Sequence, residues 1–195
     1  MKRHGILVDI HTRETYSAEI TIKSGIIRHI QRTNNIEKAY IIPGLIYSHI
    51  HIESSMITPG AFAMTAVNHG TCNVVSDPHE IANVLGLRGV EFMIKDAEMV
   101  PLNFFFGAPS CVPATDFESN GAIMNHQVVS QLLRLTEIKY LSEMMNFPGV
   151  IYDDPEVLKK IACAKKLGKP VDGHAPGLRG ESLKKYVAAG ITTDH

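Results

Sequence analysis

Histidines and carboxylates stand at the ends of several short apolar runs in this chain of 195 residues. His49 and His51 close the first of these runs, Glu143 closes a later one, and His174 and His195 close the last two. In an extended strand, residues i and i+2 face the same side, so the imidazoles of His49 and His51 can reach one ion. Metal-binding side chains recurring at strand ends predict a metal site.

Glu143 has the chemistry of a bridge between two cations. A carboxylate placed between two ions offsets their mutual repulsion, and the imidazoles of His174 and His195 can complete the sphere of a second ion. Two ions about 3.5–4 Å apart can hold and acidify one water molecule. The residues therefore predict a site for two divalent ions.

A further polar segment, Asp77-Pro78-His79-Glu80, follows another apolar run. One interpretation is structural, because Asp77 and Glu80 can stabilise a helix that begins near Pro78. The other is functional, because Asp77, His79 and Glu80 then lie at the same strand ends as the predicted ligands. Both interpretations stay open at the level of the sequence.

The elements that must position these residues change in character at Pro43. Residues 1–42 contain β-rich runs and a turn signal at Lys23-Ser24-Gly25, which is typical of a small β-element. After Pro43, short apolar runs alternate with helical stretches, which predicts βα units and a parallel sheet. The predicted strands cover 44–49, 71–76, 102–108, 138–143, 170–174 and 191–195. The clearest predicted helices cover 154–167 and 181–189.

Six successive strands suit either a (β/α)8 barrel or an open doubly wound sheet. No Gly-x-Gly-x-x-Gly motif follows an early strand and no phosphate loop is present, which disfavours the open nucleotide-binding sheet. In a barrel the active site lies at the carboxyl ends of the strands, where the candidate ligands stand. We therefore predict an α/β fold, an incomplete TIM-type barrel of about six strands over 43–195, preceded by a partial β-sandwich element over 1–42.

Composition narrows the possible partners. The formal net charge of −1 gives no electrostatic case for nucleic acid or an anionic membrane surface. No apolar run is long enough for a membrane span, and the amino terminus lacks the apolar stretch of a signal peptide. The odd number of cysteines, at Cys72, Cys111 and Cys163, argues against a disulfide framework and favours a reducing cytoplasm.

Several motifs resemble those of a known family. The segment Pro43-Gly44-Leu45-Ile46-Tyr47-Ser48-His49-Ile50-His51 resembles the first-strand signature of the amidohydrolase superfamily. Further segments are similar to adenine deaminases in particular, and they occur in one collinear order: Ile52–Ser55, Val75–Val84, Pro109–Thr115, Glu143–Val150, Gly173–Leu178 and Asp194-His195. The resemblance covers nearly the whole chain.

The resemblance implies a barrel beside a small β-domain, and the hydrolysis of adenine to hypoxanthine and ammonia. It implies that manganese or iron occupies the site, although the ligand types permit zinc equally. It assigns His49 and His51 to one ion, Glu143 to the bridge, and His174 and His195 to the other ion. We take as candidate catalytic residues Glu143, Glu80 and His79. The expected partner is a small purine, and the full-length enzyme is expected to form a homo-oligomer.

The chain departs from the family in two respects. Tyr47 stands where the family usually has Asp, which affects the support of the metal ligands. Strands seven and eight are missing, with the family's strand-eight Asp, so we expect an amino-terminal fragment. Its open sheet edges predict association or aggregation and no appreciable adenine deaminase activity of the chain alone. The alternatives are an inactive metal-binding remnant and an amidohydrolase acting on another cyclic amidine or amide.

Overall fold

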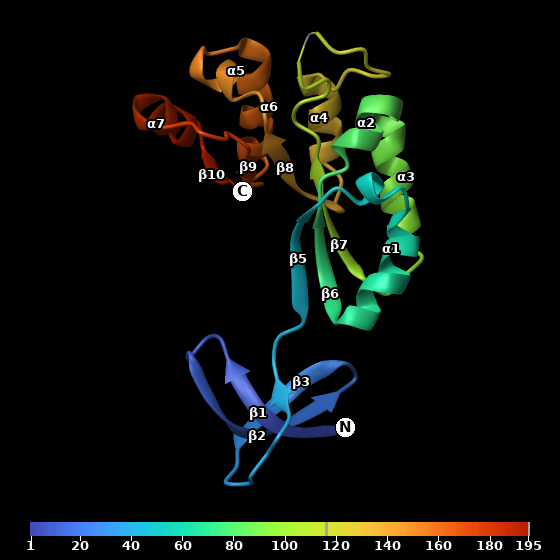
Figure 1. Cartoon of the computed structure of the whole chain (residues 1–195), viewed down its shortest axis with the longest axis vertical. Coiled ribbons are helices and arrows are strands. Elements are labelled where there is room, and N and C mark those ends of the chain that lie inside the picture. The colour runs from blue at the N-terminus through green and yellow to red at the C-terminus, as the bar shows by residue number, and fades with distance from the viewer. Residues whose placement is uncertain (116, 195) are drawn as a thin grey trace. The chain divides into compact units, whose positions relative to one another are not determined.

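The computed structural model describes residues 1–115 and 117–194, and the chain divides into two compact units (Figure 1). The first unit is Met1–Gly44 and the second is Leu45–His195. Each unit has its own sheet and its own hydrophobic core. Among the described residues, no helix has the length and apolar character needed to cross a membrane.

The first unit is a four-stranded sheet in the order β3-β2-β1-β4. Its strands are β1 (Lys2–Asp9), β2 (Glu14–Lys23), β3 (Ile26–Arg32) and β4 (Tyr40–Ile41). Strands β2 and β3 form a hairpin at the predicted turn, where Ser24 and Gly25 both have positive φ angles, of 52° and 74°. Two such residues suit the tight turns whose twist matches that of the flanking strands. Leu7, Ala18 and Ile20 form the core of this sheet.

The second unit contains six parallel strands in the order β10-β9-β8-β7-β6-β5, curled into part of a barrel (Figure 1). The strands are β5 (Leu45–Ile50), β6 (Thr71–Ser76), β7 (Asn103–Ala108), β8 (Ile138–Met144), β9 (Val171–Gly173) and β10 (Ile191–Thr193). The spatial order follows the order in the sequence, as successive βα units require. The predicted barrel-type fold is therefore confirmed over these six strands.

Helices separate the strands along the chain. They are η1 (Ile52–Ser55), α1 (Pro59–Ala66), η2 (Val67–His69), α2 (His79–Leu85), α3 (Leu87–Ala97), α4 (His126–Leu133), α5 (Phe147–Ile151), α6 (Pro155–Lys166) and α7 (Gly180–Ala188). Side chains from both the strands and the helices form one continuous core, which includes Val74, Phe106, Leu132, Leu141, Ile161 and Tyr186. The inner strand β8 is buried at six of its seven positions, so packing on both faces holds its end in place.

Helix α6 begins and ends at the local capping signals from which it was predicted. The Asp154 carboxylate accepts hydrogen bonds from the backbone of Glu156 and Val157, at 2.8 and 3.2 Å, and Pro155 occupies the first turn. Gly168 then adopts a left-handed conformation, with φ of 67°, and stops the helix. The predicted helix over 154–167 is confirmed, and that over 181–189 lies one residue earlier, as α7.

Two predicted strands are too long. The strand predicted over 170–174 is formed only at Val171–Gly173, because the backbone N–H of His174 donates to the hydroxyl group of Tyr186 at 3.0 Å instead of continuing the sheet. The strand predicted over 191–195 is formed at Ile191–Thr193, and His195 lies outside the described residues. Conversely, β8 extends one residue beyond Glu143.

Candidate metal centre

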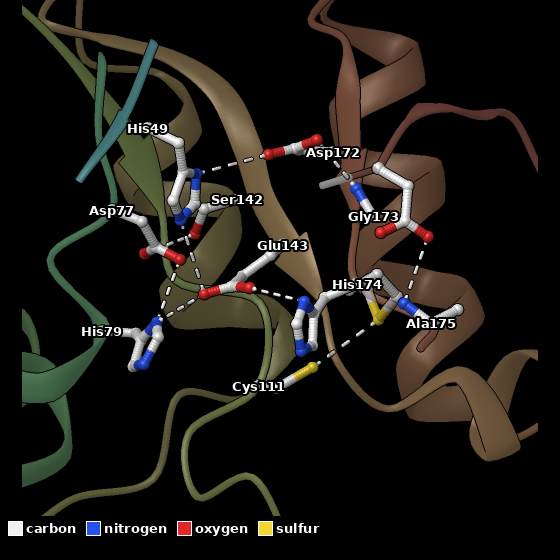
Figure 2. A network of polar contacts seen from close by, with 12 residues as sticks. His49, Asp77, His79, Cys111, Ser142, Glu143, Asp172, Gly173, His174 and Ala175 are labelled. Carbon is white, nitrogen blue, oxygen red and sulfur yellow. Dashed lines mark hydrogen bonds and ion pairs between the residues drawn. The ribbon is translucent and has the colours of Figure 1, made fainter. Parts of the chain in front are cut away.

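The carboxyl ends of the parallel strands bring most of the sequence-predicted residues together (Figure 2). His49 lies on β5 and His51 directly after it, Glu143 lies on β8, and His174 follows β9. His79 begins α2, two residues after Asp77, which follows β6. This arrangement results from the parallel sheet, because every strand ends on the same side. The fifth predicted ligand, His195, is not among the described residues.

Glu143 occupies the middle of the group. Its Oε1 lies 3.1 Å from Nε2 of His51 and 3.4 Å from Nδ1 of His79. Its Oε2 lies 3.4 Å from Nδ1 of His174. The two carboxylate oxygens therefore face imidazoles from different strands, as a bridging carboxylate does. His49 approaches from the same side as His51, with its Nε2 3.1 Å from Nε2 of His51 and 3.8 Å from Oε1 of Glu143.

The polar segment after β6 joins the same group. The Asp77 side chain is fully buried, and its Oδ2 lies 3.0 Å from Nδ1 of His79. Helix α2 begins at His79 without a side-chain cap hydrogen bond, although all of its residues are described. Asp77 therefore makes no capping hydrogen bond to this helix, whereas Glu80 lies in its first turn. The Asp77 carboxylate binds His79 and the hydroxyl group of Ser142 instead.

The ring of His51 is oriented for coordination. Its Nδ1 lies 2.9 Å from the backbone carbonyl oxygen of Asp77. A carbonyl oxygen only accepts hydrogen bonds, so Nδ1 carries the proton and Nε2 is the atom turned toward Glu143. A backbone acceptor of this kind commonly fixes the tautomer of a metal-binding histidine. The donor set of imidazole nitrogens and carboxylate oxygens therefore fits a divalent transition metal.

Burial disfavours charge in this site, but close opposite charges outweigh its effect. Burial lowers the pKa of His51, whereas its contacts with Glu143 and with the Asp77 carbonyl raise that pKa, to a net value of about 9. Burial raises the pKa of Glu143, whereas the hydrogen bond from His51 and the charge of His79 lower it, to a net value of about 2. The surroundings thus favour an ionised carboxylate beside positive charge.

A second layer of contacts holds the backbone near Glu143. The hydroxyl group of Ser110 donates to the carbonyl oxygen of Glu143 at 2.5 Å. The hydroxyl group of Tyr186 donates to the carbonyl oxygen of Met144 at 2.9 Å and accepts from the backbone N–H of His174 at 3.0 Å. These bonds fix the ends of β8 and β9 relative to each other.

Helix α6 holds both ends of the long connection between β7 and α4. Lys160, buried with 7% of its surface exposed, donates from Nζ to the carbonyl oxygen of Ser110 at 2.8 Å. Glu156 accepts from the backbone N–H of His126 at 2.5 Å, and its other carboxylate oxygen lies 2.7 Å from the ring Nδ1 of His126. Residues 110 and 126 are therefore both hydrogen-bonded to side chains of α6.

These supporting residues were not predicted from the sequence. Lys160 offered a signal, because it falls among Val157, Ile161 and Ala164 on the buried side of α6, where a lysine is out of place. Ser142 offered a weaker one, as a small polar residue directly before Glu143 in a mostly apolar strand. Tyr186 gave no signal in the sequence.

A cavity of about 250 Å³ lies beside the candidate metal centre, and His79 lines it. Glu80, Asn83, Cys111 and Met145 also line it. The Glu80 carboxylate is held by the hydroxyl group of Ser54, at 2.5 Å. Ionisable and apolar side chains thus face one space.

Tyr47 cannot supply the carboxylate that the resembling family usually has at this position. Its ring contacts Phe62 of α1 edge to face, with the ring centroids 6.3 Å apart. The side chain is about half exposed. It therefore packs as an aromatic residue beside α1.

Comparisons with known proteins agree with this geometry. The sequence model of the amidohydrolase family matches residues 40–195. An adenine deaminase from Methanosarcina mazei is 53% identical over all of this chain, and one from Sulfurovum is 55% identical over 96% of it. The chain spans 35% of the length of each of these curated relatives.

Solved structures share the fold at low sequence identity. N-isopropylammelide isopropylaminohydrolase from Burkholderia multivorans matches 89% of this chain and 53% of its own, with a TM-score of 0.53 and 15% identity. The β-aspartyl dipeptidase of Fervidobacterium islandicum matches 96% of this chain and 56% of its own, with a TM-score of 0.51 and 13% identity. With the family match over most of the chain, these findings establish that the chain belongs to the amidohydrolase family.

Proposed function

We propose that this chain is the metal-binding part of an enzyme that hydrolyses adenine to hypoxanthine and ammonia. The observation that carries the proposal is the placement of Glu143 between imidazoles from different strands, in a chain about half identical to adenine deaminases along its whole length. Because the chain spans 35% of those relatives, the activity is proposed for the complete barrel. Residues 43–195 would form its amino-terminal part, and residues 1–42 part of the accompanying β-domain.

The proposed metal ligands are His49, His51, Glu143, His174 and His195. Glu143 is suited to bridging two ions, because each of its oxygens faces a different histidine. The family resemblance favours manganese or iron, and the nitrogen and oxygen donors also accept zinc. When bound, the ions supply an acidified water molecule and stabilise negative charge that develops on the substrate.

The proposed catalytic residues are Glu143, Glu80 and His79, and the purine would occupy the cavity beside His79. Glu80 lines this cavity, and its hydrogen bond from Ser54 fixes the carboxylate there. A carboxylate in this position can accept a proton as water adds to the ring carbon and return that proton to the amine, which leaves as ammonia. His79 lies between the cavity and Glu143, so it can orient the ring edge that reacts.

We also propose a cellular compartment, a class of partners and an oligomeric state for the complete enzyme. The free thiols of Cys72, Cys111 and Cys163 favour a reducing compartment, so we place the protein in the cytoplasm. The formal charge of −1 gives no reason to expect a nucleic acid or a membrane as partner. The complete enzyme is proposed to form a homo-oligomer.

The test is a chimera in which the remaining carboxyl-terminal length of the Methanosarcina mazei relative follows residue 195. Purified with manganese, it is expected to release ammonia from adenine and little from adenosine. The matched variant Glu80→Gln keeps the volume of the side chain and is expected to lower kcat by about 10²-fold or more. A chimera that preferred adenosine or another cyclic amidine would contradict the proposed substrate. A metal-loaded, folded chimera without activity would favour a non-catalytic remnant.

A further inference from the structure

The ring of His49 lies between two carboxylates that come from different strands (Figure 2). Its Nε2 faces the candidate metal centre, 3.1 Å from Nε2 of His51 and 3.8 Å from Oε1 of Glu143. Its Nδ1 lies 3.8 Å from Oδ2 of Asp172, which is on β9. Asp172 therefore contacts the ring nitrogen that does not face the centre.

The carboxylate of Asp172 is held in this orientation through its other oxygen. Oδ1 accepts from the hydroxyl group of Thr193 at 2.6 Å and from the backbone N–H of Gly173 at 3.0 Å. The side chains of Asp172 and His49 are each only 17% exposed, so water competes little for their contact. With Oδ1 bound to the sheet, Oδ2 is kept toward the imidazole.

This placement selects one protonation form of His49. A carboxylate oxygen only accepts hydrogen bonds, so Nδ1 can bond to Asp172 only when it carries a proton. The lone pair of the neutral ring is then on Nε2, which is the atom that a metal ion needs. A carboxylate behind Nδ1 also makes Nε2 a stronger donor. His51 obtains the same form from the carbonyl oxygen of Asp77, so the two histidines have different acceptors.

The present separation of 3.8 Å is that of an ion pair, and it is longer than the usual N–H···O distance of about 3.0 Å. A movement of about 0.8 Å closes the difference, which small side-chain rotations provide. Hydrogen bonds in functional sites are often long before the ligand binds and shorten in the complex. We therefore expect the bond between His49 and Asp172 to form when Nε2 binds an ion.

Position 47 gives this contact added weight. The resembling family usually has Asp there, two residues before His49, whereas Tyr47 has no carboxylate and packs against Phe62. The acidic side chain that faces Nδ1 of His49 comes instead from β9, across the sheet. Orientation of the first ligand pair then depends on a residue outside the strand that carries it.

We propose that Asp172 is a positioning residue, which accepts a hydrogen bond from Nδ1 of His49 and fixes the ring with Nε2 toward the ion. Asp172 is not itself a ligand in this assignment. The inference rests on the metal binding in the proposed function, but it does not depend on the substrate. Its test measures metal affinity and an imidazole proton, so its failure is distinguishable from a failure of adenine hydrolysis.

The first measurement titrates the metal-free chain with Co²⁺ and follows the visible absorption of the bound ion. Asp172→Asn keeps the shape of the side chain and removes its charge, and it is expected to weaken binding by about 10- to 100-fold. Thr193→Val removes one bond to Oδ1 but leaves the carboxylate, so it is expected to weaken binding by a smaller factor. Asp153→Asn, at an exposed carboxylate paired with Lys185, is the matched control and is expected to bind as the wild type does.

The second measurement is nuclear magnetic resonance of the zinc-loaded chain with ¹⁵N-labelled histidine, and it needs no stable Asp172 variant. The Nδ1–H proton of His49, assigned by its loss in His49→Ala, is expected to resonate downfield and to exchange slowly with water. In Asp172→Asn it is expected to move upfield, which a role in fastening β10 to β9 would not cause.

Circular dichroism establishes that each metal-free variant is folded. Undiminished cobalt affinity in folded Asp172→Asn would overturn the inference. So would equal losses in Asp172→Asn and Thr193→Val, because Asp172 would then act only by holding the strands together. A freely exchanging Nδ1–H proton of His49 in the zinc-loaded wild type would overturn it as well.

Discussion

The hydroxyl group of Ser142 lies 2.7 Å from Oδ1 of Asp77, although 65 positions separate the two residues in the sequence. It also lies 2.9 Å from the carbonyl oxygen of Ala108. One buried hydroxyl group thus connects the carboxyl ends of β6, β7 and β8 next to Glu143. The ligand cluster is therefore supported by polar contacts within the sheet.

Removal of this hydroxyl group is expected to destabilise the fold. In Ser142→Ala, the buried carboxylate of Asp77 loses its donor, which costs about 1–3 kcal/mol. Urea unfolding of the metal-free chain measures the change. Ser76→Ala is the matched control, because the buried hydroxyl group of Ser76 has no hydrogen-bond partner among the described residues. An equal loss in both variants would contradict a specific role for Ser142.

Tyr186→Phe is expected to lower the free energy of unfolding by about 1–3 kcal/mol. The variant keeps the buried ring but leaves the carbonyl oxygen of Met144 and the N–H of His174 without the hydroxyl group that joins them. Tyr152→Phe, at an exposed tyrosine, is the control and is expected to change stability by no more than about 0.5 kcal/mol. Similar denaturation midpoints for the wild type and Tyr186→Phe would show that the bridge contributes nothing.

Lys160 predicts a dependence of stability on pH. Burial lowers the pKa of Lys160 below its usual value of 10.5, so between the folded and unfolded pKa values the unfolded chain binds more protons. Stability from this group therefore increases as the pH rises through that window. We expect the difference in unfolding free energy between the wild type and Lys160→Met to shift in favour of the wild type as the pH rises toward 10.5. A constant difference would contradict the prediction, and Lys159→Met, on the exposed side of α6, is the control.

The double variant His49→Ala/His51→Ala is expected to lose bound metal. The Nε2 atoms of the two rings lie 3.1 Å apart beside Glu143, so the variant removes two donors from one position. Elemental analysis after dialysis against a limiting amount of Mn²⁺ measures the content, with His69→Ala as the control. Equal metal content in the double variant and the wild type would refute the assignment.

The sequence was sufficient to predict which residues end the strands. It was not sufficient to predict the side chains that hold those residues in place. His49, His51 and Glu143 could be placed because each closes an apolar run, and parallel strands bring such ends together. Ser142 and Lys160 could not, because their partners lie 65 and 50 positions away and leave no local pattern. The end of β9 was misplaced because a distant tyrosine, and not a local signal, terminates the strand at His174.

The attachment of residues 110 and 126 to α6 has a consequence for how this protein can diverge. Because both ends of the connection between β7 and α4 are bound to one helix, a change in its length alters the closure entropy only slowly. Cys111, at the start of this loop, lines the cavity, whereas Glu143 is on the sheet. Natural variation or engineering can therefore remodel the loop, and with it the fit of a ligand, while the ion-binding side chains keep their positions.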